Sequence, residues 1–208
     1  MKFRSLLLIV FLGLLTTASN AFAVAAPERL QKIDIGFDIS GAITTDSELS
    51  SAAYVGFNAA YGVKDWLAIG VSLGRTQFSQ NETIAGSVTI PGPDISAYPL
   101  FVDFIFKKEF EDKPYVPYAV LGLGTIFWKT KDVFGANNLQ YESSIDTSLA
   151  LKMGAGVDWF LDDHWALNLN FDYILTNSTA ALTNGTISTR EDINLDYWNL
   201  GGGVKYLF

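Results

Sequence analysis

The 208-residue sequence contains no cysteine and a single histidine, His164. Without cysteine the chain has neither a disulfide framework nor a thiolate metal site. Basic residues are also scarce, because 14 Lys and Arg stand against 22 Asp and Glu, a formal net charge of −8. Such an acidic chain lacks the electrostatic footprint of a nucleic-acid-binding protein, so we expect no nucleic-acid partner.

Long hydrophobic runs are missing as well, although 49% of the residues are hydrophobic. After the first 23 residues, the longest uncharged apolar stretch is the 15 residues 114–128, which contain Pro117, Gly122 and Gly124. A membrane-spanning helix needs about 20 apolar residues. If the apolar residues face lipid, they must do so on strands. Strands satisfy their backbone polar groups in hydrocarbon only as a closed barrel.

The first 23 residues have the order of parts of a secretory signal peptide. Lys2 and Arg4 precede an apolar core over residues 6–15, and Ala21-Phe22-Ala23 forms a small-residue cleavage site, with Ala25-Ala26 as a second one. An uncleaved anchor helix is the alternative, but the core is short for spanning a membrane. We expect residues 1–23 to be cleaved, which leaves residues 24–208 as one exported domain.

Period-two alternation, typical of strands with unlike faces, runs through most of that domain. In residues 32–40, Ile and Phe alternate with Lys, Asp, Gly and Ser, and residues 149–159 and 165–175 show the same rhythm. A soluble sandwich would bury the apolar face in its core. A membrane barrel turns the apolar face to lipid and keeps the polar face inside.

The lengths of the connections favour the barrel over the sandwich. Strands are predicted over residues 32–43, 52–62, 66–78, 95–108, 114–128, 146–160, 164–176 and 195–208. Long polar connections (44–51, 79–94, 129–145 and 177–194) alternate with short ones (63–65, 109–113 and 161–163). Short periplasmic turns and longer extracellular loops are the pattern of outer-membrane barrels. The predicted fold is an all-β, eight-stranded antiparallel up-and-down transmembrane β-barrel of a bacterial outer membrane, with both termini in the periplasm.

Aromatic residues are expected to form a band at each membrane interface. The band near the long loops comprises Tyr98, Phe127, Trp128, Tyr173, Tyr197 and Trp198. The band near the short turns comprises Phe106, Tyr115, Trp159, Trp165, Tyr206 and Phe208. The alternative is that aromatic side chains fill a core. Trp66 falls outside the alternation of its strand.

The last strand ends on an aromatic residue. Counting back from Phe208, the outward positions include Tyr206, Val204, Leu200 and Trp198. This ending resembles the terminal strand of outer-membrane proteins. The resemblance implies that the barrel-assembly machinery is a partner and reads these five residues as an assembly signal.

The second half of the chain, from about residue 95, resembles the OmpW family of small outer-membrane barrels. The matching motifs are Lys113-Pro114-Tyr115-Val116 before Gly122-Leu123-Gly124, residues 153–160 (MGAGVDWF), residues 161–168 (LDDHWALN), residues 195–198 (LDYW) and residues 204–208 (VKYLF). Residues 61–66 (YGVKDW) carry a looser match in the first half. The resemblance implies a narrow hydrophobic interior and the passage of small hydrophobic molecules.

An eight-stranded barrel is only wide enough for side chains or one small ligand. The parity of a position, that is, whether it falls on the inward or the outward face of the alternating strand, predicts the lumen-facing residues. They are Asp34, Asp38, Phe101, Asp103, Ile105, Lys152, Asp158, Asp172 and Lys205. Charges in so narrow an interior should be paired, either as a structural plug of salt bridges or as a polar gate along a solute path. Phe101 and Ile105 predict an apolar sector of the lumen, whereas Phe104 is predicted to face lipid.

No catalytic, metal or cofactor site is predicted. A Ser-His-acid site needs a histidine at the active face, and His164 lies in a short turn beside Asp162 and Asp163. We therefore expect that this protein is not an enzyme. Two functions remain open. The first is a narrow conduit for small hydrophobic molecules across the outer membrane, with outer-membrane lipids and such solutes as partners. The second is a non-transporting structural surface barrel that acts through its extracellular loops in adhesion or envelope integrity.

Overall fold

The computed structural model describes residues 30–45, 49–79, 83–85, 88–90, 94–110, 113–130, 133–134, 140–183 and 188–208. Among these residues no helix is long and apolar enough to cross a membrane. The predicted signal peptide, residues 1–23, lies outside the described residues, and its cleavage stays a prediction.

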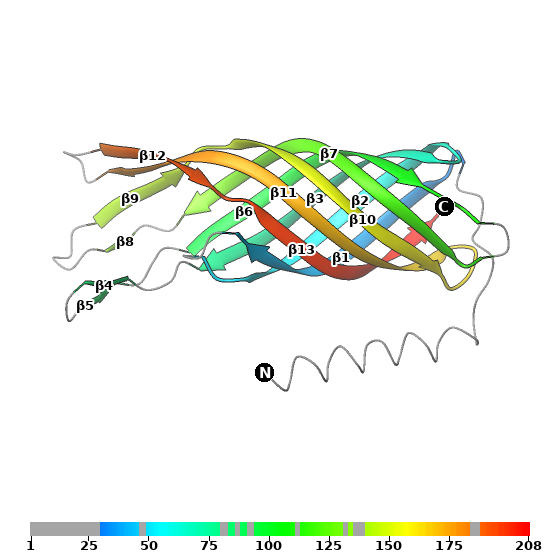
Figure 1. Ribbon diagram of the computed structural model, residues 1–208, viewed down its shortest axis with the longest axis horizontal. Coiled ribbons are helices and arrows are strands. Elements are labelled where there is room, and N and C mark those ends of the chain that lie inside the picture. The colour runs from blue at the N-terminus through cyan, green and yellow to red at the C-terminus, as the bar shows by residue number, and fades with distance from the viewer. Residues whose placement is uncertain are drawn as a thin grey trace, which may run out of the picture.

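Eight long antiparallel strands form the wall of a closed barrel (Figure 1). They are β1 (Ile33–Thr44), β2 (Ala52–Lys64), β3 (Leu67–Ser79), β6 (Asp94–Lys107), β7 (Tyr115–Thr130), β10 (Ser148–Phe160), β11 (Trp165–Thr183) and β13 (Tyr197–Leu207). Each pairs with the next along the chain, and β13 pairs with β1 from Asp34↔Leu207 to Thr44↔Tyr197. Closure provides backbone partners on both sides of each strand, as a hydrocarbon environment requires. The predicted eight-stranded up-and-down barrel is confirmed.

The outside of this wall is apolar. In β1, Phe37 and Ile39 are exposed, whereas the alternate residues Asp38 and Ser40 are buried inside. On the last strand, Leu200 is 61% exposed. Soluble monomers rarely expose a continuous apolar surface. The apolar residues therefore lie on the outer face and the polar residues on the inner face, as expected of a barrel whose outer face meets lipid.

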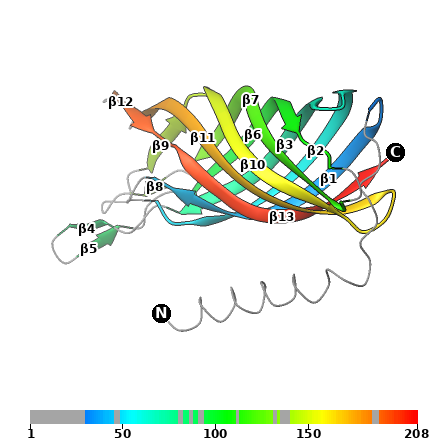
Figure 2. The same ribbon diagram turned by 45° about the vertical axis from the view of Figure 1, so that its right-hand side comes forward.

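The connections are sorted between the two ends of the barrel (Figures 1 and 2). The short turns and the C-terminus lie at one end, which we call the turn end. The opposite end, the loop end, carries the long connections and five short strands. These are β4 (Thr83–Ala85), β5 (Val88–Ile90), β8 (Val133–Phe134), β9 (Gln140–Ile145) and β12 (Ser188–Asn194).

One strand is longer than predicted. β11 continues to Thr183, where it pairs with β12 from Asn177↔Asn194 to Thr183↔Ser188 and with β9 at Ala180↔Ile145. The prediction that 177–194 is a loop is therefore wrong for both halves of this hairpin. The backbone ladder continues where the apolar alternation has stopped, because residues 177–183 are mostly Asn, Ser, Thr and Ala.

Two short turns show how local chemistry ends a strand. In the turn before β11, the backbone N–H groups of His164 and Trp165 donate to Asp162 Oδ1 at 2.8 and 2.7 Å. These two hydrogen bonds hold the pKa of Asp162 below its usual value. Trp66 lies in the turn after β2, beyond a register shift between Gly62 and Lys64, and stacks on Phe106. This irregularity explains why Trp66 falls outside the alternation.

Candidate functional site in the barrel interior

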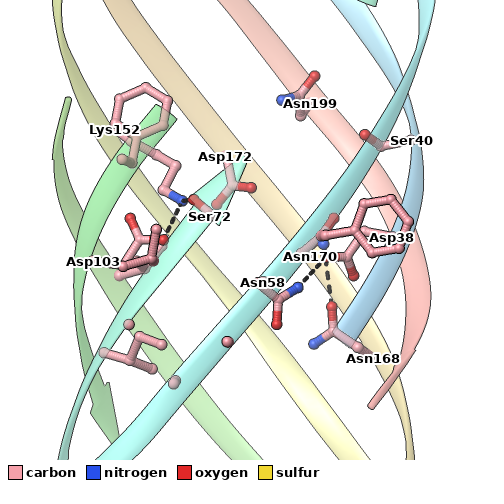
Figure 3. A pocket seen from close by; sticks show the side chains of 18 of the residues that line it. Asp38, Ser40, Asn58, Ser72, Asp103, Lys152, Asn168, Asn170, Asp172 and Asn199 are labelled. Atoms are coloured by element: carbon pink, nitrogen blue, oxygen red, sulfur yellow. Dashed lines mark hydrogen bonds and ion pairs between the residues drawn. The ribbon is translucent and has the colours of Figure 1, made fainter. Parts of the chain in front are cut away.

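The middle of the barrel is filled by a set of inward polar side chains that we call the central polar layer (Figure 3). It comprises Asp38, Asn58, Ser72, Asp103, Lys152, Asp158, Asn168, Asn170, Asp172 and Lys205. They come from β1, β2, β3, β6, β10, β11 and β13, and each occupies an inward position of its strand. Polar residues reach the interior here because the period-two alternation assigns one face of every strand to it.

Two ion pairs organise the central polar layer. Lys152 Nζ lies 2.7 Å from Asp103 Oδ2, donates to Ser72 Oγ at 2.8 Å and sits 5.0 Å above the ring of Phe101. Lys205 Nζ lies 2.9 Å from Asp158 Oδ1. Asn168 Nδ2 donates to the same carboxylate oxygen at 2.7 Å.

These pairs join strands that are far apart in the sequence. Lys152 on β10 meets Asp103 on β6 and Ser72 on β3, which lie on the other side of β7. The lysines are nearly buried, at 9% exposed for Lys152 and 8% for Lys205. Charges so far from water need partners of this kind, since an unpaired buried charge is costly. The charged layer therefore links strands that are not direct neighbours in the wall.

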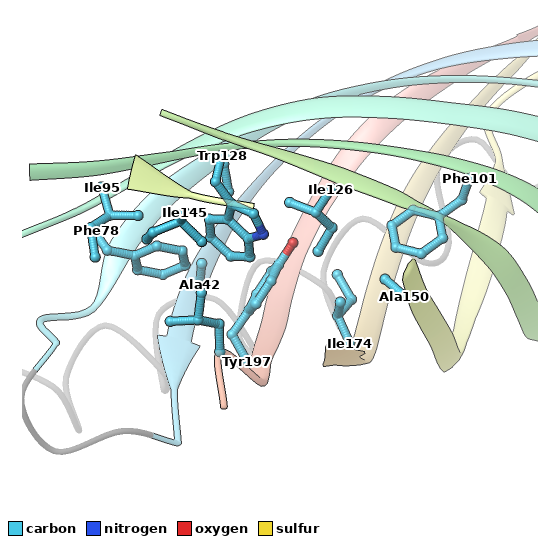
Figure 4. Packing of buried hydrophobic residues seen from close by; sticks show 12 residues of the cluster. Ala42, Phe78, Ile95, Phe101, Ile126, Trp128, Ile145, Ala150, Ile174 and Tyr197 are labelled. Carbon is cyan, nitrogen blue, oxygen red and sulfur yellow. The ribbon is translucent and has the colours of Figure 1, made fainter. Parts of the chain in front are cut away.

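An apolar cluster fills the interior towards the loop end (Figure 4). This loop-end cluster comprises Ala42, Phe78, Ile95, Ala97, Phe101, Ile126, Trp128, Ile145, Ala150, Ile174, Leu195 and Tyr197. Phe78 and Tyr197 meet edge to face with their ring centroids 5.5 Å apart. Trp128 Nε1 donates to Ser148 Oγ at 2.9 Å, so the indole N–H is paired within the apolar surroundings.

The aromatic band predicted near the long loops is wrong for two residues. Tyr197 is 0% exposed and Trp128 is 7% exposed, and both point into the loop-end cluster. An aromatic residue near the end of a membrane strand suits the interface and the interior almost equally. The inward or outward parity of the position decides between interface and interior, and both residues occupy inward positions.

A smaller apolar cluster lies at the turn end, formed by Val116, Phe160, Ala166 and Leu207. The lumen is therefore layered along the barrel axis, with apolar side chains at both ends and polar ones between them. Phe101 and Ile105, from which an apolar sector of the lumen is predicted, both point inward and line the central cavity, but at different heights. Phe101 belongs to the loop-end cluster, whereas Ile105 on the same strand borders the central polar layer. The difference arises because residues four apart on a tilted strand lie at different heights in the barrel.

The structure brings seven of the nine predicted lumen residues around one central cavity. They are Asp38, Phe101, Asp103, Ile105, Lys152, Asp172 and Lys205. The other two, Asp34 and Asp158, border a second, smaller space with Phe160 and Leu207, on the side of the central polar layer that faces the turn end. The prediction omitted further cavity residues, including Tyr54, Asn58, Ser72, Tyr118 and Asn199. Extending the parity count to the uncharged polar and tyrosine residues of every strand would find them.

The central cavity has a volume of about 70 Å³. Sites for drug-sized ligands are typically about 300–1,000 Å³, so the central cavity suits water or an ion.

The wall is interrupted at one place beside the loop-end cluster. Pairing between β3 and β6 runs to Leu73↔Leu100 and resumes only at Thr76↔Ala97. Pro99 lies in the gap and has no N–H to donate to a ladder. On the inward face Pro99 is flanked by Ala97 and Phe101, both members of the loop-end cluster. We call this interruption the β3–β6 seam.

A model of the family described as outer membrane protein beta-barrel domain matches residues 9–208 of the chain. The chain belongs to this family. It is a bacterial outer-membrane barrel, as the outward apolar wall and the closed sheet indicate.

Within this barrel family, individual relatives are of the OmpW type. Outer membrane protein W of Vibrio cholerae is 27% identical over 175 residues, which cover 79% of each chain. The crystal structure of OprG from Pseudomonas aeruginosa superimposes with a TM-score of 0.75 at 16% identity, covering 88% of this chain and 99% of OprG. OmpW of E. coli gives a TM-score of 0.56 at 15% identity, covering 86% and 99%. The resemblance to the OmpW family is confirmed.

The outer wall of this family member presents the five residues of the predicted assembly signal. Leu200, Val204 and Phe208 are exposed, and Trp198 and Tyr206 are half-buried. Trp198 stacks on Tyr173, with 4.0 Å between ring centroids.

The single histidine of the barrel is also on the surface. His164 is exposed in the turn before β11 and stacks on Tyr206. Within the described residues, no group of three or more His, Cys, Asp or Glu side chains could hold a metal ion.

Proposed function

We propose that this outer-membrane barrel is a narrow conduit for small hydrophobic molecules, which enter at the loop end and leave sideways through the wall. The observation that carries the proposal is the contact between the loop-end cluster and the β3–β6 seam. An apolar solute is compatible with the side chains of the loop-end cluster. The next layer along the axis is charged, and an apolar solute there would displace buried hydrogen bonds and ion pairs. A sideways exit avoids that cost.

The β3–β6 seam has the composition that such an exit needs. Gly74 lies on the inward face of β3 and has no side chain. The register is the same before and after the interruption, and it places Pro99 on β6 opposite Gly74. The hydroxyl group and ring edge of Tyr54 occupy the space where a Cβ of Gly74 would stand. On the outer face Arg75 and Lys129 approach the ring of Tyr98 at 5.8 and 5.5 Å. A rotation of Tyr54 and a small separation of β3 and β6 would join the loop-end cluster to lipid.

A reversible lock across the seam tests this route. Arg75 and Tyr98 face each other in the continuing register, and the natural chain has no cysteine. We expect the Arg75→Cys/Tyr98→Cys variant to form a disulfide on oxidation, because directly paired strand positions lie about 4.5–5.5 Å apart. Uptake of a small apolar compound by cells carrying the oxidised variant should fall to that of cells lacking the protein. Reduction with dithiothreitol should restore it.

The matched control is Val102→Cys/Leu123→Cys. These residues face each other on the outer surface across the uninterrupted β6–β7 pairing. Oxidation should leave uptake through this variant unchanged. Equal uptake by the oxidised and reduced forms of the seam variant would contradict the sideways route. The conduit itself would be contradicted by a different result. In that case cells with the natural chain, or with either cysteine pair reduced, would take up no more of the compound than cells lacking the protein.

The second candidate function is a surface barrel that acts through its loops without transport. The paired extension of β11 with β9 and β12 favours it, because this polar sheet continues past the apolar part of the wall. It becomes the better proposal if the natural chain supports no uptake. Neither candidate is an enzyme.

The orientation in the membrane follows from export and assembly. We place the turn end and both termini of the mature chain in the periplasm, with a signal peptide of residues 1–23 removed on the way. Phe208 N donates to Ile33 O at 2.9 Å, so the first and last strands meet at that end. The long loops would then face the cell exterior.

The C-terminal residues are proposed as the signal for the barrel-assembly machinery. The Phe208 side chain is 63% exposed, so it contributes little to packing in the finished barrel. We expect Phe208→Ala to lower the amount of assembled barrel in cells, measured by the difference in gel migration between unboiled and boiled samples. Phe208→Tyr keeps an aromatic end and should assemble normally. The purified Phe208→Ala chain should refold in detergent as well as the natural chain does, and a comparable loss there would mean that Phe208 acts through stability.

A further inference from the structure

The central polar layer carries more negative than positive charge. Four aspartates, Asp38, Asp103, Asp158 and Asp172, face two lysines, Lys152 and Lys205, which leaves a formal charge of −2. The lysines are committed to Asp103 and Asp158. Asp38 and Asp172 therefore remain as carboxylates without a salt bridge in the described part of the chain.

Among the described residues, the fully buried side-chain atoms that border the central cavity and lack a hydrogen-bond partner are all carboxylate or amide oxygens. Oδ1 of each of four lining residues, Asp38, Asp103, Asn170 and Asn199, receives no hydrogen bond from any described residue. Asn199 is 3% exposed and Asp38 is 8% exposed. Asn170 Nδ2 donates to Asn168 Oδ1 at 3.1 Å, which directs its own oxygen away from that bond. The side chains of Asp38, Asn170, Asp172 and Asn199 come from three strands and border one space (Figure 3).

A cation would compensate both the excess negative charge and the unpaired oxygens. A buried carboxylate is costly unless a positive charge or several donors compensate it. Buried amide oxygens likewise need donors or a cation. Carboxylate and amide oxygens are the ligands of hard cations such as Ca²⁺ and Mg²⁺. A cavity of about 70 Å³ has room for such an ion with some of its water.

We propose that the central cavity binds a small hard cation through oxygen ligands. Asp38 and Asp172 supply the charge, and Asn170 and Asn199 supply neutral oxygens. A bound divalent cation neutralises the formal charge of −2 in the central polar layer, a monovalent one halves it, and either links β1, β11 and β13. The proposal does not depend on the sideways route, although Tyr54 and Phe101 border both.

Stability against cation concentration tests the site in the whole barrel. The purified protein, refolded in a zwitterionic detergent and freed of metals, is heated in series at constant ionic strength. Choline chloride is replaced stepwise by NaCl in one series and by CaCl₂ in another. The readout is the temperature at which half of the folded band is lost on an unboiled gel. A ligand that binds only the folded state raises this midpoint in a saturable way. We expect Na⁺ or Ca²⁺ to do so and choline, which is too large for the cavity, to have no effect.

Two variants assign the response to the cavity. Asp172→Asn and Asp38→Asn each keep the shape of the side chain and remove one charge. Each should raise the half-saturating cation concentration by about tenfold or more, because affinity for hard cations follows the charge of the ligands. The control, Asp162→Asn, removes a carboxylate that is exposed in a turn and should leave the response unchanged.

A second measurement reports binding directly. Tb³⁺ is a hard cation whose emission rises when it binds close to an excited tyrosine, and Tyr54 and Tyr118 both line the cavity. The natural protein should show saturable Tb³⁺ emission that Asp172→Asn and Asp38→Asn weaken and Asp162→Asn does not. The proposal is overturned if Na⁺ and Ca²⁺ shift the midpoint no more than choline does. It is also overturned if both cavity variants respond to cations and to Tb³⁺ like the natural protein, since the ions would then bind elsewhere.

Discussion

Replacing Lys152 with methionine is expected to destabilise the folded barrel by about 3–5 kcal/mol, the cost of breaking a buried ion pair by removing one partner. Methionine preserves most of the volume of the lysine side chain and removes the ammonium group. Asp103 would lose its ion pair of 2.7 Å, and Ser72 would lose its donor. The central polar layer would change from a formal charge of −2 to −3. Asp103 is only 4% exposed, so bulk water compensates little of the lost ion pair and the cost falls on the folded state.

This loss is measurable as the urea concentration at which half of the refolded barrel unfolds in detergent. The control is Lys129→Met, which removes an exposed lysine on the outer side of β7 and should shift the midpoint little. The double variant Asp103→Asn/Lys152→Met should recover part of the loss, because it removes the unpaired charge as well. A Lys152→Met midpoint equal to that of the natural chain would show that the ion pairs do not stabilise the barrel.

Replacing Gly203 with valine is expected to prevent closure of the barrel. Gly203 on β13 faces Asp38 on β1, in the pairing that joins the last strand to the first. A Cβ at Gly203 would stand 2.1 Å from the backbone oxygen of Phe37 and 2.4 Å from Asp38 Oδ1. The backbone oxygen cannot withdraw without disturbing the β1–β13 ladder. An open edge in hydrocarbon leaves backbone groups unpaired, at several kcal/mol for each group.

The expected result is a Gly203→Val chain that is synthesised but shows no difference in migration between unboiled and boiled samples. A matched control exists on the same strand pair. Gly41 on β1 faces Leu200, and a Cβ there would meet its nearest atom at 4.0 Å, an ordinary contact. Gly41→Ala should therefore assemble normally. Normal assembly of Gly203→Val would mean that β1 and β13 separate more easily than this close approach implies.

The number of strands and the face of each residue could be predicted from the sequence. Successive side chains of a strand point to opposite faces. A charged residue such as Asp38 therefore marks the inward face, and an apolar neighbour such as Phe37 marks the outward face. Connection lengths supplied the up-and-down order. The predicted end of β11 falls too early because residues 176–181 are polar or small on both faces, where alternation carries no signal.

The candidate site was predicted less completely, since parity gives the face of a residue and not its neighbours. Asp103 and Lys152 are 49 residues apart, and nothing in their local sequence indicates that they meet. Trp128 and Tyr197 lie near strand ends, a position that favours the membrane interface, but their inward parity places both in the loop-end cluster. The β3–β6 seam had one signal, Pro99, whose effect depends on where the opposite strand places its backbone groups.

By itself the sequence determined that this chain forms a closed barrel with an apolar exterior and a partly charged interior. It could do so because alternation is a local property and because strands in lipid must close. The tertiary structure alone decided that the interior is layered, with ion pairs between apolar clusters and an acceptor-lined cavity among them. Height along the barrel depends on strand tilt and on the register of every pair of strands, and these arise only when segments far apart in the sequence are brought together.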